Sequence, residues 1–365
     1  MFIELHIIQN FAPSNLNRDD TNTPKDCEFG GVRRARISSQ CFKRAVRHHP
    51  VFAATTGVPL SHRSNMMKAE LVRRLTAGGL GEAEAAARAE EFAKWYSSKA
   101  GKMDKNKTLT LIFLSEAEFQ SAFDFLREHE AAAEIKAFAE EMAKTTKNRP
   151  GAPDIALFGR MLADRPETNI DAACQVAHAI STHAVNMDMD FFTAVDDLQQ
   201  KQENPETGAG MMGLGGFNSA CFYRYACIDF DQLLTSLKGD TALAVRTVEA
   251  FLRASVKAVP TGKQNSSAAQ NPPSFLMTVV RRDGSAWSLA NAFEKPVSPN
   301  GQGLVHSSVK ALDAYWGRLT SFYGGDAQPV VAVLDDDAPL TALKPACVAS
   351  LEDWIKETLN LVSQG

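Results

Sequence analysis

The order of strand-like and helix-like segments constrains the fold of this chain more than any other feature. Residues 2–11 are apolar and β-branched and predict a strand that ends before Pro13. Residues 61–145 are rich in Ala, Glu and Lys with apolar positions at helical spacing, so they predict a helical insertion outside the sheet. Residues 221–230 are again typical of a strand.

The rest of the chain continues this pattern. We expect further strands at residues 274–281 and 330–334 and further helices at residues 171–183, 241–257, 305–320 and 349–361. The order of strand, helix, helical insertion, strand, helix and strand predicts an α+β fold. At about 150 residues per domain, the 365 residues make roughly two domains.

Composition excludes several classes of protein. No run approaches the ~18 consecutive apolar residues of a membrane span, and the first residues lack the basic and apolar regions of a signal peptide. The six cysteines are scattered without a CxxC pair, which favours free thiols over a disulfide framework or a zinc ribbon. We therefore expect a cytoplasmic protein without a metal or another cofactor.

A basic segment near the N-terminus contrasts with the net charge of −4. Residues 32–49 hold six Lys and Arg and no acid, whereas residues 326–365 hold seven Asp and Glu and two Lys. Ser38 or Ser39 is predicted to cap a helix that Pro50 ends. Helical spacing places four polar side chains on one face of this helix, namely Gln40, Lys43, Arg44 and Arg47.

This basic face could bind a polyanion, because Arg pairs with phosphate oxygens in a bidentate manner and Lys adds a point charge. Each phosphate contact on a single strand changes the slope of log K against log salt by about −0.7. With three or four contacts, one copy of the chain should hold RNA weakly and several copies together should hold it tightly. The alternative is a solvated face whose cations make only surface ion pairs.

A glycine-rich segment at residues 194–220 precedes the strand at 221–230 and predicts an extended hairpin arm. Met211, Met212 and Leu214 lie among its glycines. Apolar side chains at the tip of such an arm could wedge between bases, dock on a neighbouring subunit, or belong to a disordered segment.

Three aspartates in the polar, turn-rich loop at residues 14–31 are the candidates for catalysis. Asp19, Asp20 and Asp26 could hold Mg²⁺ for phosphodiester cleavage, although Asp in such loops also serves turns and caps. His178 and His183 would lie about 140° apart on the predicted helix, so they do not form a metal-binding pair on one face. No residue pattern in the sequence requires catalysis.

Seven blocks of sequence carry a family resemblance: SNLNRDD (14–20), FGGVRRARISSQCFKRAVR (29–47), DIALFGRM (154–161), AHAISTHAV (177–185), DMDFFTAVDDLQ (188–199), FYRYACID (222–229) and LANAFEKPV (289–297). In these blocks the chain resembles the CasC-type backbone subunit of the type I-E CRISPR surveillance complex, Cascade. The blocks keep the order of the family and span nearly the whole chain.

The resemblance implies a particular α+β architecture. A modified RNA-recognition-motif (ferredoxin-like) palm would comprise residues 1–58 and 187–365. A helical fingers insertion would comprise residues 59–186, and a β-hairpin thumb would lie at about residues 194–221.

The resemblance also implies a non-catalytic role in antiviral defence. Family members assemble side by side as a helical filament along the CRISPR RNA (crRNA). The thumb of one copy folds over the RNA toward the next and displaces a base at regular intervals, and the segments between pair with target DNA. The implied partners are crRNA, target DNA through the crRNA, copies of the chain itself and other Cascade subunits.

Matching by position implies the RNA-binding residues. The palm contacts are Arg18, Lys25, Ser38, Ser39, Gln40, Lys43, Arg44 and Arg47. Met161 matches the apolar residue beside the displaced base, and either Met212 or Leu214 would be its partner on the thumb. Lys263 and Gln264 match a loop that faces the nucleic acid, beyond which the sequence departs from the family pattern.

Two alternatives to this scaffold function stay open. The first is a metal-dependent RNA endonuclease of the same fold that uses Asp19, Asp20 and Asp26, because related subunits of type III complexes cleave RNA through a loop aspartate. The second is a helical oligomer without a role in nucleic-acid binding.

Overall fold

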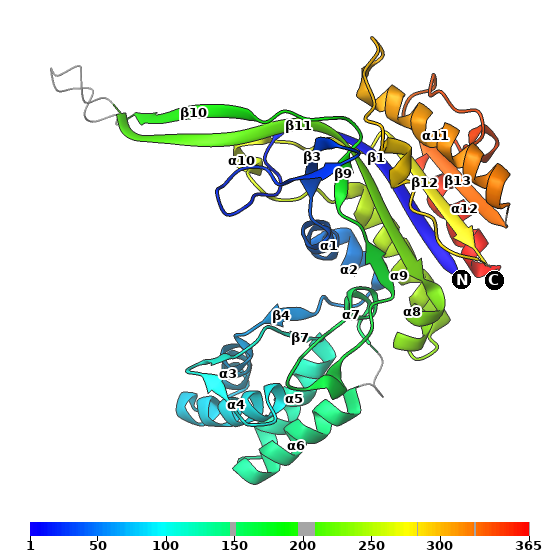
Figure 1. Cartoon of the computed structure of the whole chain (residues 1–365). Coiled ribbons are helices and arrows are strands. Elements are labelled where there is room, and N and C mark those ends of the chain that lie inside the picture. The colour runs from blue at the N-terminus through cyan, green and yellow to red at the C-terminus, as the bar shows by residue number, and fades with distance from the viewer. Residues whose placement is uncertain (147–150, 196–208, 283, 325, 365) are drawn as a thin grey trace. The chain divides into compact units, whose positions relative to one another are not determined.

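A computed structural model describes residues 1–146, 151–195, 209–282, 284–324 and 326–364 (Figure 1). The chain divides into two compact units. Residues 1–49, 176–227 and 252–365 form the first, here called the sheet unit, and residues 50–175 and 228–251 form the second, here called the helical unit. The family resemblance implies boundaries after residues 58 and 186, whereas the compact units divide after residues 49, 175, 227 and 251.

The sheet unit is built on one sheet with the strand order β13-β12-β1-β11-β9-β3-β2 (Figure 1). Two further strands, β8 and β10, pair with β11. The strands are β1 (Phe2–Ser14), β2 (Asp26–Phe29), β3 (Val32–Ile37), β8 (Cys174–Val176), β9 (Ala179–Ser181), β10 (Asp188–Val195), β11 (Ala209–Asp229), β12 (Phe275–Arg281) and β13 (Ala327–Val333). The pairs β1–β12, β12–β13, β3–β9 and β2–β3 are antiparallel, so the fold is α+β.

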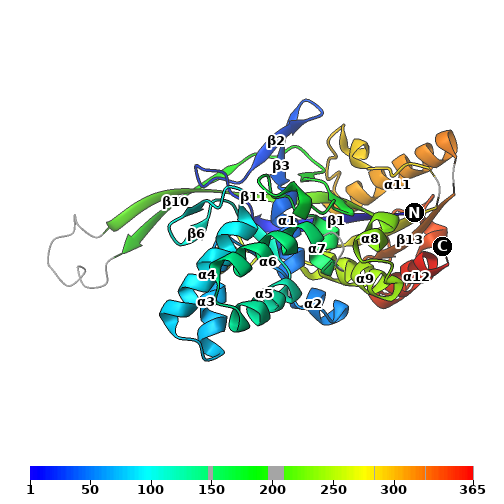
Figure 2. The same ribbon diagram turned by 90° about the horizontal axis from the view of Figure 1, so that it is seen from below.

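Helices cover both faces of this sheet, and α11 and α12 lie on opposite sides of it (Figure 2). The helices are α1 (Ser39–His48), α9 (Thr241–Lys257, shared with the helical unit), α10 (Gln264–Ser267), η4 (Ala290–Phe293), α11 (Gly303–Tyr323), η5 (Lys344–Ala346) and α12 (Leu351–Ser363). One face packs Phe275, Met277 and Val279 against Leu312 and Trp316 of α11. No helix among the described residues is long and apolar enough to cross a membrane.

Because helices cover both faces, the middle of β1 is buried throughout, and its polar side chains are paired inside the protein. Glu4 accepts a hydrogen bond from Arg281 and lies 3.3 Å (Oε2–Nε2) from His6. The Nδ1 atom of His6 is 2.8 Å from the hydroxyl of Tyr223. Burial lowers the pKa of His6, which favours the neutral ring.

The helical unit has its own core. Its elements are α2 (Pro50–Thr56), β4 (His62–Ser64), α3 (Met67–Ala77), α4 (Glu82–Ser97), β5 (Met103–Asp104), β6 (Lys107–Thr108), β7 (Ile112–Leu114), α5 (Glu116–Glu128), α6 (Ala132–Thr145), α7 (Pro153–Phe158), η2 (Pro166–Thr168) and α8 (Phe230–Ser236). Met67, Leu71 and Leu75 recur every four residues along α3 and are buried against α4 and α5. The predicted helical composition of residues 61–145 is confirmed, and two short strand pairs, β4–β7 and β5–β6, lie among the helices.

Most of the predicted strands and helices are confirmed. Residues 2–11 lie in β1, residues 221–229 form the end of β11, and the strands predicted at 274–281 and 330–334 correspond to β12 and β13. The predicted helices near residues 39–49, 241–257, 305–320 and 349–361 correspond to α1, α9, α11 and α12.

The helix predicted at residues 171–183 is wrong, because this segment forms β8 and β9. Ile180 of β9 pairs with Arg36 of β3 on one side and with Tyr223 of β11 on the other. Pairing with two strands overrides the helix propensity of an alanine-containing segment. His178 and His183 therefore do not share a helix, and the predicted polar loop at residues 14–31 likewise contains a strand, β2.

The predicted hairpin arm is present, with different bounds. β10 and β11 pair antiparallel from Asp188↔Phe217 to Val195↔Ala209, so the hairpin begins six residues before the predicted start at residue 194 (Figure 1). Residues 196–208 lie outside the described part of the chain.

Candidate nucleic-acid interface

Helix α1 is capped at its start and buries two apolar side chains. The hydroxyl of Ser38 accepts a hydrogen bond from the backbone N–H of Cys41, as an N-cap residue does. Phe42 and Val46 are buried. The guanidinium of Arg224 on β11 lies 4.1 Å from the centre of the Phe42 ring and is held by Gln9 and by the carbonyl of Ser255.

The polar face of α1 is only partly as predicted. Gln40 and Arg44 are exposed and Lys43 is half-buried. Arg47 differs, because only 9% of it is exposed and its guanidinium lies 2.8 Å from Nε2 of His48. The row of cations offered by this helix is therefore Lys43 and Arg44, beside the amide of Gln40.

The loop that carries Arg18 and Lys25 is attached to the start of α1. The Asn17 side-chain oxygen accepts a hydrogen bond from the backbone N–H of Ser38, and the Asn17 carbonyl accepts one from Lys25. Arg18 is exposed and donates to the side-chain oxygen of Asn22. Asn17 thus holds two predicted RNA contacts, Arg18 and Lys25, next to the cap of the basic helix.

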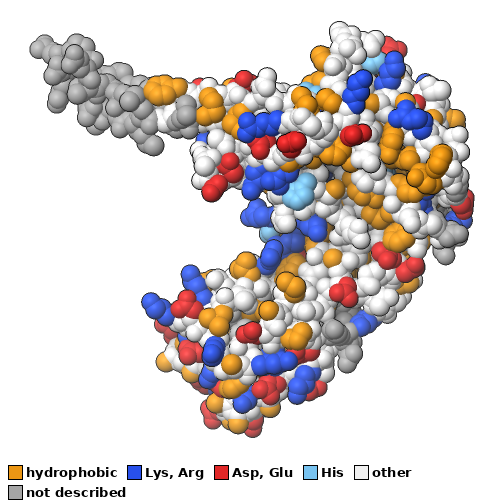
Figure 3. Space-filling model, in the orientation of Figure 1, with side chains coloured by type: hydrophobic (Ala, Val, Ile, Leu, Met, Phe, Trp, Pro, Cys, Tyr) orange, Lys and Arg blue, Asp and Glu red, His pale blue; other side chains and the backbone are white. Residues whose placement is uncertain are grey.

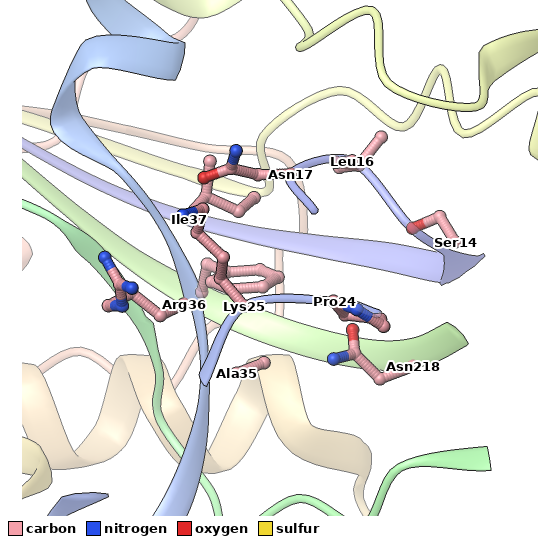
Figure 4. Close-up of a pocket in the computed structure, with 10 residues that line it drawn as sticks. Ser14, Leu16, Asn17, Pro24, Lys25, Ala35, Arg36, Ile37 and Asn218 are labelled. Atoms are coloured by element: carbon pink, nitrogen blue, oxygen red, sulfur yellow. The ribbon is translucent and has the colours of Figure 1, made fainter. Parts of the chain in front are cut away.

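A small pocket marks this junction. Figure 4 shows the side chains of Asn17, Lys25 and Arg36 around it, with Pro24 and Asn218 on another wall. Figure 3 shows Lys and Arg side chains gathered, with a histidine, over the region of β2, β3 and α1. We call five cations of this region the basic edge: Arg18 and Arg44, which are exposed, and Lys25, Arg36 and Lys43, which are half-buried.

The three arginines of β3 have different roles. Arg33 forms an ion pair with Asp26 across the β2–β3 hairpin. Arg34 is fully buried and donates to the backbone carbonyls of Phe29, Ser181, Phe293 and Glu294. The exposed pair of Arg33 with Asp26 is of the kind that the alternative of surface ion pairs describes. Arg34 is buried on backbone carbonyls and offers no charge to a ligand, and we include Arg36 of this strand in the basic edge.

The predicted loop contact at Lys263 and Gln264 also lies in the sheet unit. Gly262 is so close to the preceding loop that an added Cβ would lie 2.3 Å from the carbonyl oxygen of Leu16. Gly262 shares a shallow polar depression with Arg18 and Asn22. The structure therefore brings the Lys263–Gln264 segment beside the Arg18 loop, although Gln264 itself donates to the carbonyl of Pro260.

Met161, in the helical unit, is 82% exposed although both of its neighbours are buried. Arg160 donates to the carboxylate of Glu118 at 2.9 Å and to the carbonyls of Phe113 and Thr168. The Leu162 N–H donates to the Asn169 side chain. Met161 is thus an apolar side chain presented by a fixed backbone.

Met212 and Leu214 lie on β11 of the hairpin, where their backbones pair with Thr193 and Phe191. Their side chains lie outside the described part of the structure. On the opposite strand, Met189 and Phe191 are exposed and two residues apart, so they share one face of the hairpin.

Two of the three candidate catalytic aspartates, Asp19 and Asp26, make contacts within the local structure. The Asp19 carboxylate accepts four hydrogen bonds from the backbone and hydroxyl groups of Thr21 and Thr23. These hydrogen bonds lower the pKa of Asp19 from 3.8 to about 2. Asp26 pairs with Arg33. Within the described ranges, no three His, Cys, Asp or Glu side chains are grouped so that they could hold a metal ion.

Replacing Asp19 with Ala is expected to loosen the loop at residues 18–25, because it removes these four hydrogen bonds. Amide hydrogen exchange at Thr21 and Thr23 should become faster, and Asp20→Ala should leave it unchanged. Since the pKa is lower in the folded chain, the stabilisation by Asp19 is present above about pH 4 and is lost as the pH falls through about 2. Equal exchange in both variants would contradict this role.

Comparison with known proteins gives two kinds of match. The profile of a family described as CT1975-like protein matches residues 3–359. A chain of a solved "CRISPR RNA-guided surveillance complex, pre-nicking" is 32% identical with a TM-score of 0.88, over 99% of each chain. A chain of another "CRISPR RNA-guided surveillance complex" is 29% identical with a TM-score of 0.66, over 99% of this chain and 100% of that one. No match was found among curated proteins.

Proposed function

This chain belongs to the CT1975-like protein family, and from that premise we propose that it is a crRNA-binding subunit of a CRISPR RNA-guided surveillance complex. The observation that carries the proposal is the basic edge, where Arg18, Lys25, Lys43 and Arg44 are held on one side of the sheet unit by shared backbone contacts. The two similar chains belong to assemblies described as surveillance complexes guided by RNA, which supports the same conclusion.

We assign the parts of the proposed subunit as follows. The sheet unit would be the palm, a modified RNA-recognition-motif sheet, and the helical unit would correspond to the fingers. The hairpin of β10 and β11 would be the thumb. The subunit would be of the CasC type in a type I-E Cascade complex and would form the backbone of a filament along the crRNA.

The proposed binding is electrostatic and tolerant of sequence. Arg and Lys side chains that contact phosphates release counterions and read no base, so affinity depends on salt rather than on base order. A single copy offers only a few such cations and should bind weakly. Tight binding would require neighbouring copies on one RNA, and pairing of the guide would supply specificity toward target DNA.

The proposed role does not include catalysis. Hydrogen bonds to Thr21 and Thr23 give Asp19 a role in its turn, and Asp26 pairs with Arg33, which supports structural roles for these two carboxylates. The observations on the described residues therefore favour the scaffold over the endonuclease that the sequence left open.

Light scattering of the purified protein with a single-stranded RNA tests the proposal. With an RNA of about 60 nucleotides, we expect a complex of several copies on intact RNA. Salt should weaken this complex, and Mg²⁺ should leave it unchanged. Shortening of the RNA that requires Mg²⁺ and is lost in an Asp19/Asp20/Asp26 triple alanine variant would instead establish the endonuclease. Assembly of several copies in the absence of RNA, with no dependence on salt, would support the helical oligomer without a role in nucleic-acid binding.

A further inference from the structure

An exposed histidine lies beside the basic edge, in the turn between β8 and β9. Arg36 of β3 pairs with Ile180 of β9, and Ile37 pairs with Ala179. Continuing this antiparallel register by one residue places His178 opposite Ser38, the N-cap of α1. The guanidinium NH1 of Arg36 lies 3.1 Å from Nδ1 of His178. Neither the spacing nor the composition of the sequence indicates this contact.

The contact with Arg36 determines which nitrogen of His178 carries the proton. A guanidinium group can only donate hydrogen bonds, so Nδ1 of His178 accepts from Arg36. The ring is then neutral, and its one N–H donor is at Nε2. Arg36 is itself anchored, because its Nε donates to the backbone carbonyl of Asp26 at 3.0 Å. The histidine ring thus has a defined orientation at the edge of the interface.

The charges around His178 oppose its protonation in the free protein. The burial of a small part of its ring lowers its pKa, and the positive charges of Arg36 on β3 and Lys25 in the loop before β2 lower it further. The charged residue of the neighbouring β11 segment, Arg224, is buried against Gln9 and Ser255. A phosphate bound among Arg36, Lys25 and His178 would offset these cations and favour the protonated ring.

We propose that His178, which Arg36 orients through Nδ1 in the free protein, is a further contact to the phosphate backbone of single-stranded RNA, and that it takes up a proton from solvent when RNA binds. This inference rests on the proposed RNA-binding function and adds a residue and a pH dependence to the same site. In the protonated ring, both nitrogen atoms of His178 are donors, so Nδ1 no longer accepts a hydrogen bond from Arg36. The ring and the Arg36 guanidinium would then both donate to phosphate oxygens.

The sign of the pH dependence follows from this arrangement. Bound RNA raises the pKa of His178 above its value in the free protein, so RNA affinity is constant at alkaline pH and increases as the pH falls through the pKa of the complex. The increase levels off below the pKa of the free protein, which lies under the ordinary value of about 6.5. The change is therefore expected between neutral and mildly acidic pH.

Fluorescence anisotropy with a labelled single-stranded RNA tests the proposal. Wild-type protein should bind about threefold to tenfold more tightly near pH 6 than near pH 8, since a pKa change of one unit corresponds to about tenfold. His178→Gln should abolish this gain. His306→Gln, which changes a histidine of α11 in the same unit, should preserve it.

The outcomes separate this inference from the proposed function. If His178→Gln still binds RNA more tightly near pH 6 than near pH 8, or if the wild-type affinity is equal at both pH values, the role of His178 is overturned and the RNA-binding function is retained. An absence of RNA binding at both pH values would overturn both. The electrostatic effect of Arg36 has its own readout, because Arg36→Gln should raise the pKa of His178 in the free protein, as followed by NMR titration of its ring protons.

Discussion

Replacing Glu118 with Ala is expected to destabilise the helical unit by about 3–5 kcal/mol, because it leaves the Arg160 guanidinium buried without its carboxylate. Only 5% of Arg160 is exposed, so water cannot replace the lost partner. Glu118 also completes a capping box with Ser115 at the start of α5, and that contact is lost too. Urea unfolding followed by circular dichroism measures the change.

Glu116→Ala is the matched control for this prediction. Glu116 lies two residues earlier in α5 and pairs with Arg74, but both side chains are partly exposed. Removing a partly exposed ion pair should cost at most about 1 kcal/mol. If Glu116→Ala and Glu118→Ala shifted the unfolding midpoint equally, burial of the Arg160–Glu118 pair would not be the cause of its contribution to stability.

This prediction has a consequence for Met161, the residue that follows Arg160. Arg160 exchanges backbone hydrogen bonds with Ile170 at 2.9 Å, and its side chain connects this bridge to Glu118. Loss of Glu118 should therefore increase amide exchange at Arg160 and Ile170.

The double variant Lys43→Ala/Arg44→Ala is expected to weaken binding of single-stranded RNA by about tenfold to a hundredfold at low salt, since each charge-assisted hydrogen bond is worth about 1.5 kcal/mol. The dependence of log K on log salt should become shallower by about 0.7 for each phosphate contact removed. Because both side chains reach away from the buried Phe42 and Val46, folding should be preserved. Fluorescence anisotropy over a salt series measures both effects.

The control for this variant makes the same change in charge elsewhere on the sheet unit. Lys310 and Arg318 are exposed on α11, which packs on the sheet through Leu312 and Trp316. Lys310→Ala/Arg318→Ala should leave both the affinity and the salt dependence close to those of the wild type. If it weakened RNA binding as much as Lys43→Ala/Arg44→Ala, the basic edge would not be the binding surface and net charge would explain the effect.

The sequence predicts the elements of this protein well where its local pattern and its tertiary environment agree. Ser38 is a good N-cap, the following residues separate into an apolar and a basic side, and α1 forms over Ser39–His48. The prediction fails at β8 and β9, where the local preference is helical and the pairing partners, β3 and β11, lie far away in the sequence.

The same distinction applies to the candidate site. A count of cations finds the basic segment, but it cannot separate Arg34, which donates to four backbone carbonyls, from Arg44, which is exposed. Nor can it show that Arg47 is nearly buried beside His48. Helical spacing gives the angle of a side chain around the helix, whereas burial depends on which neighbours cover that angle.

The sequence by itself therefore determined the α+β class, the helical insertion, the hairpin arm and the charge of the segment at residues 32–49, because each depends on residues close together in the chain. Only the tertiary structure decided which of those cations reach the surface, that Asp19 closes a turn, and that Arg36 meets His178. These outcomes depend on pairing between β3 and β9, whose residues are more than a hundred positions apart. The physical reason is that periodicity and propensity report local preferences, whereas the environment of a side chain is set by the segments that fold against it.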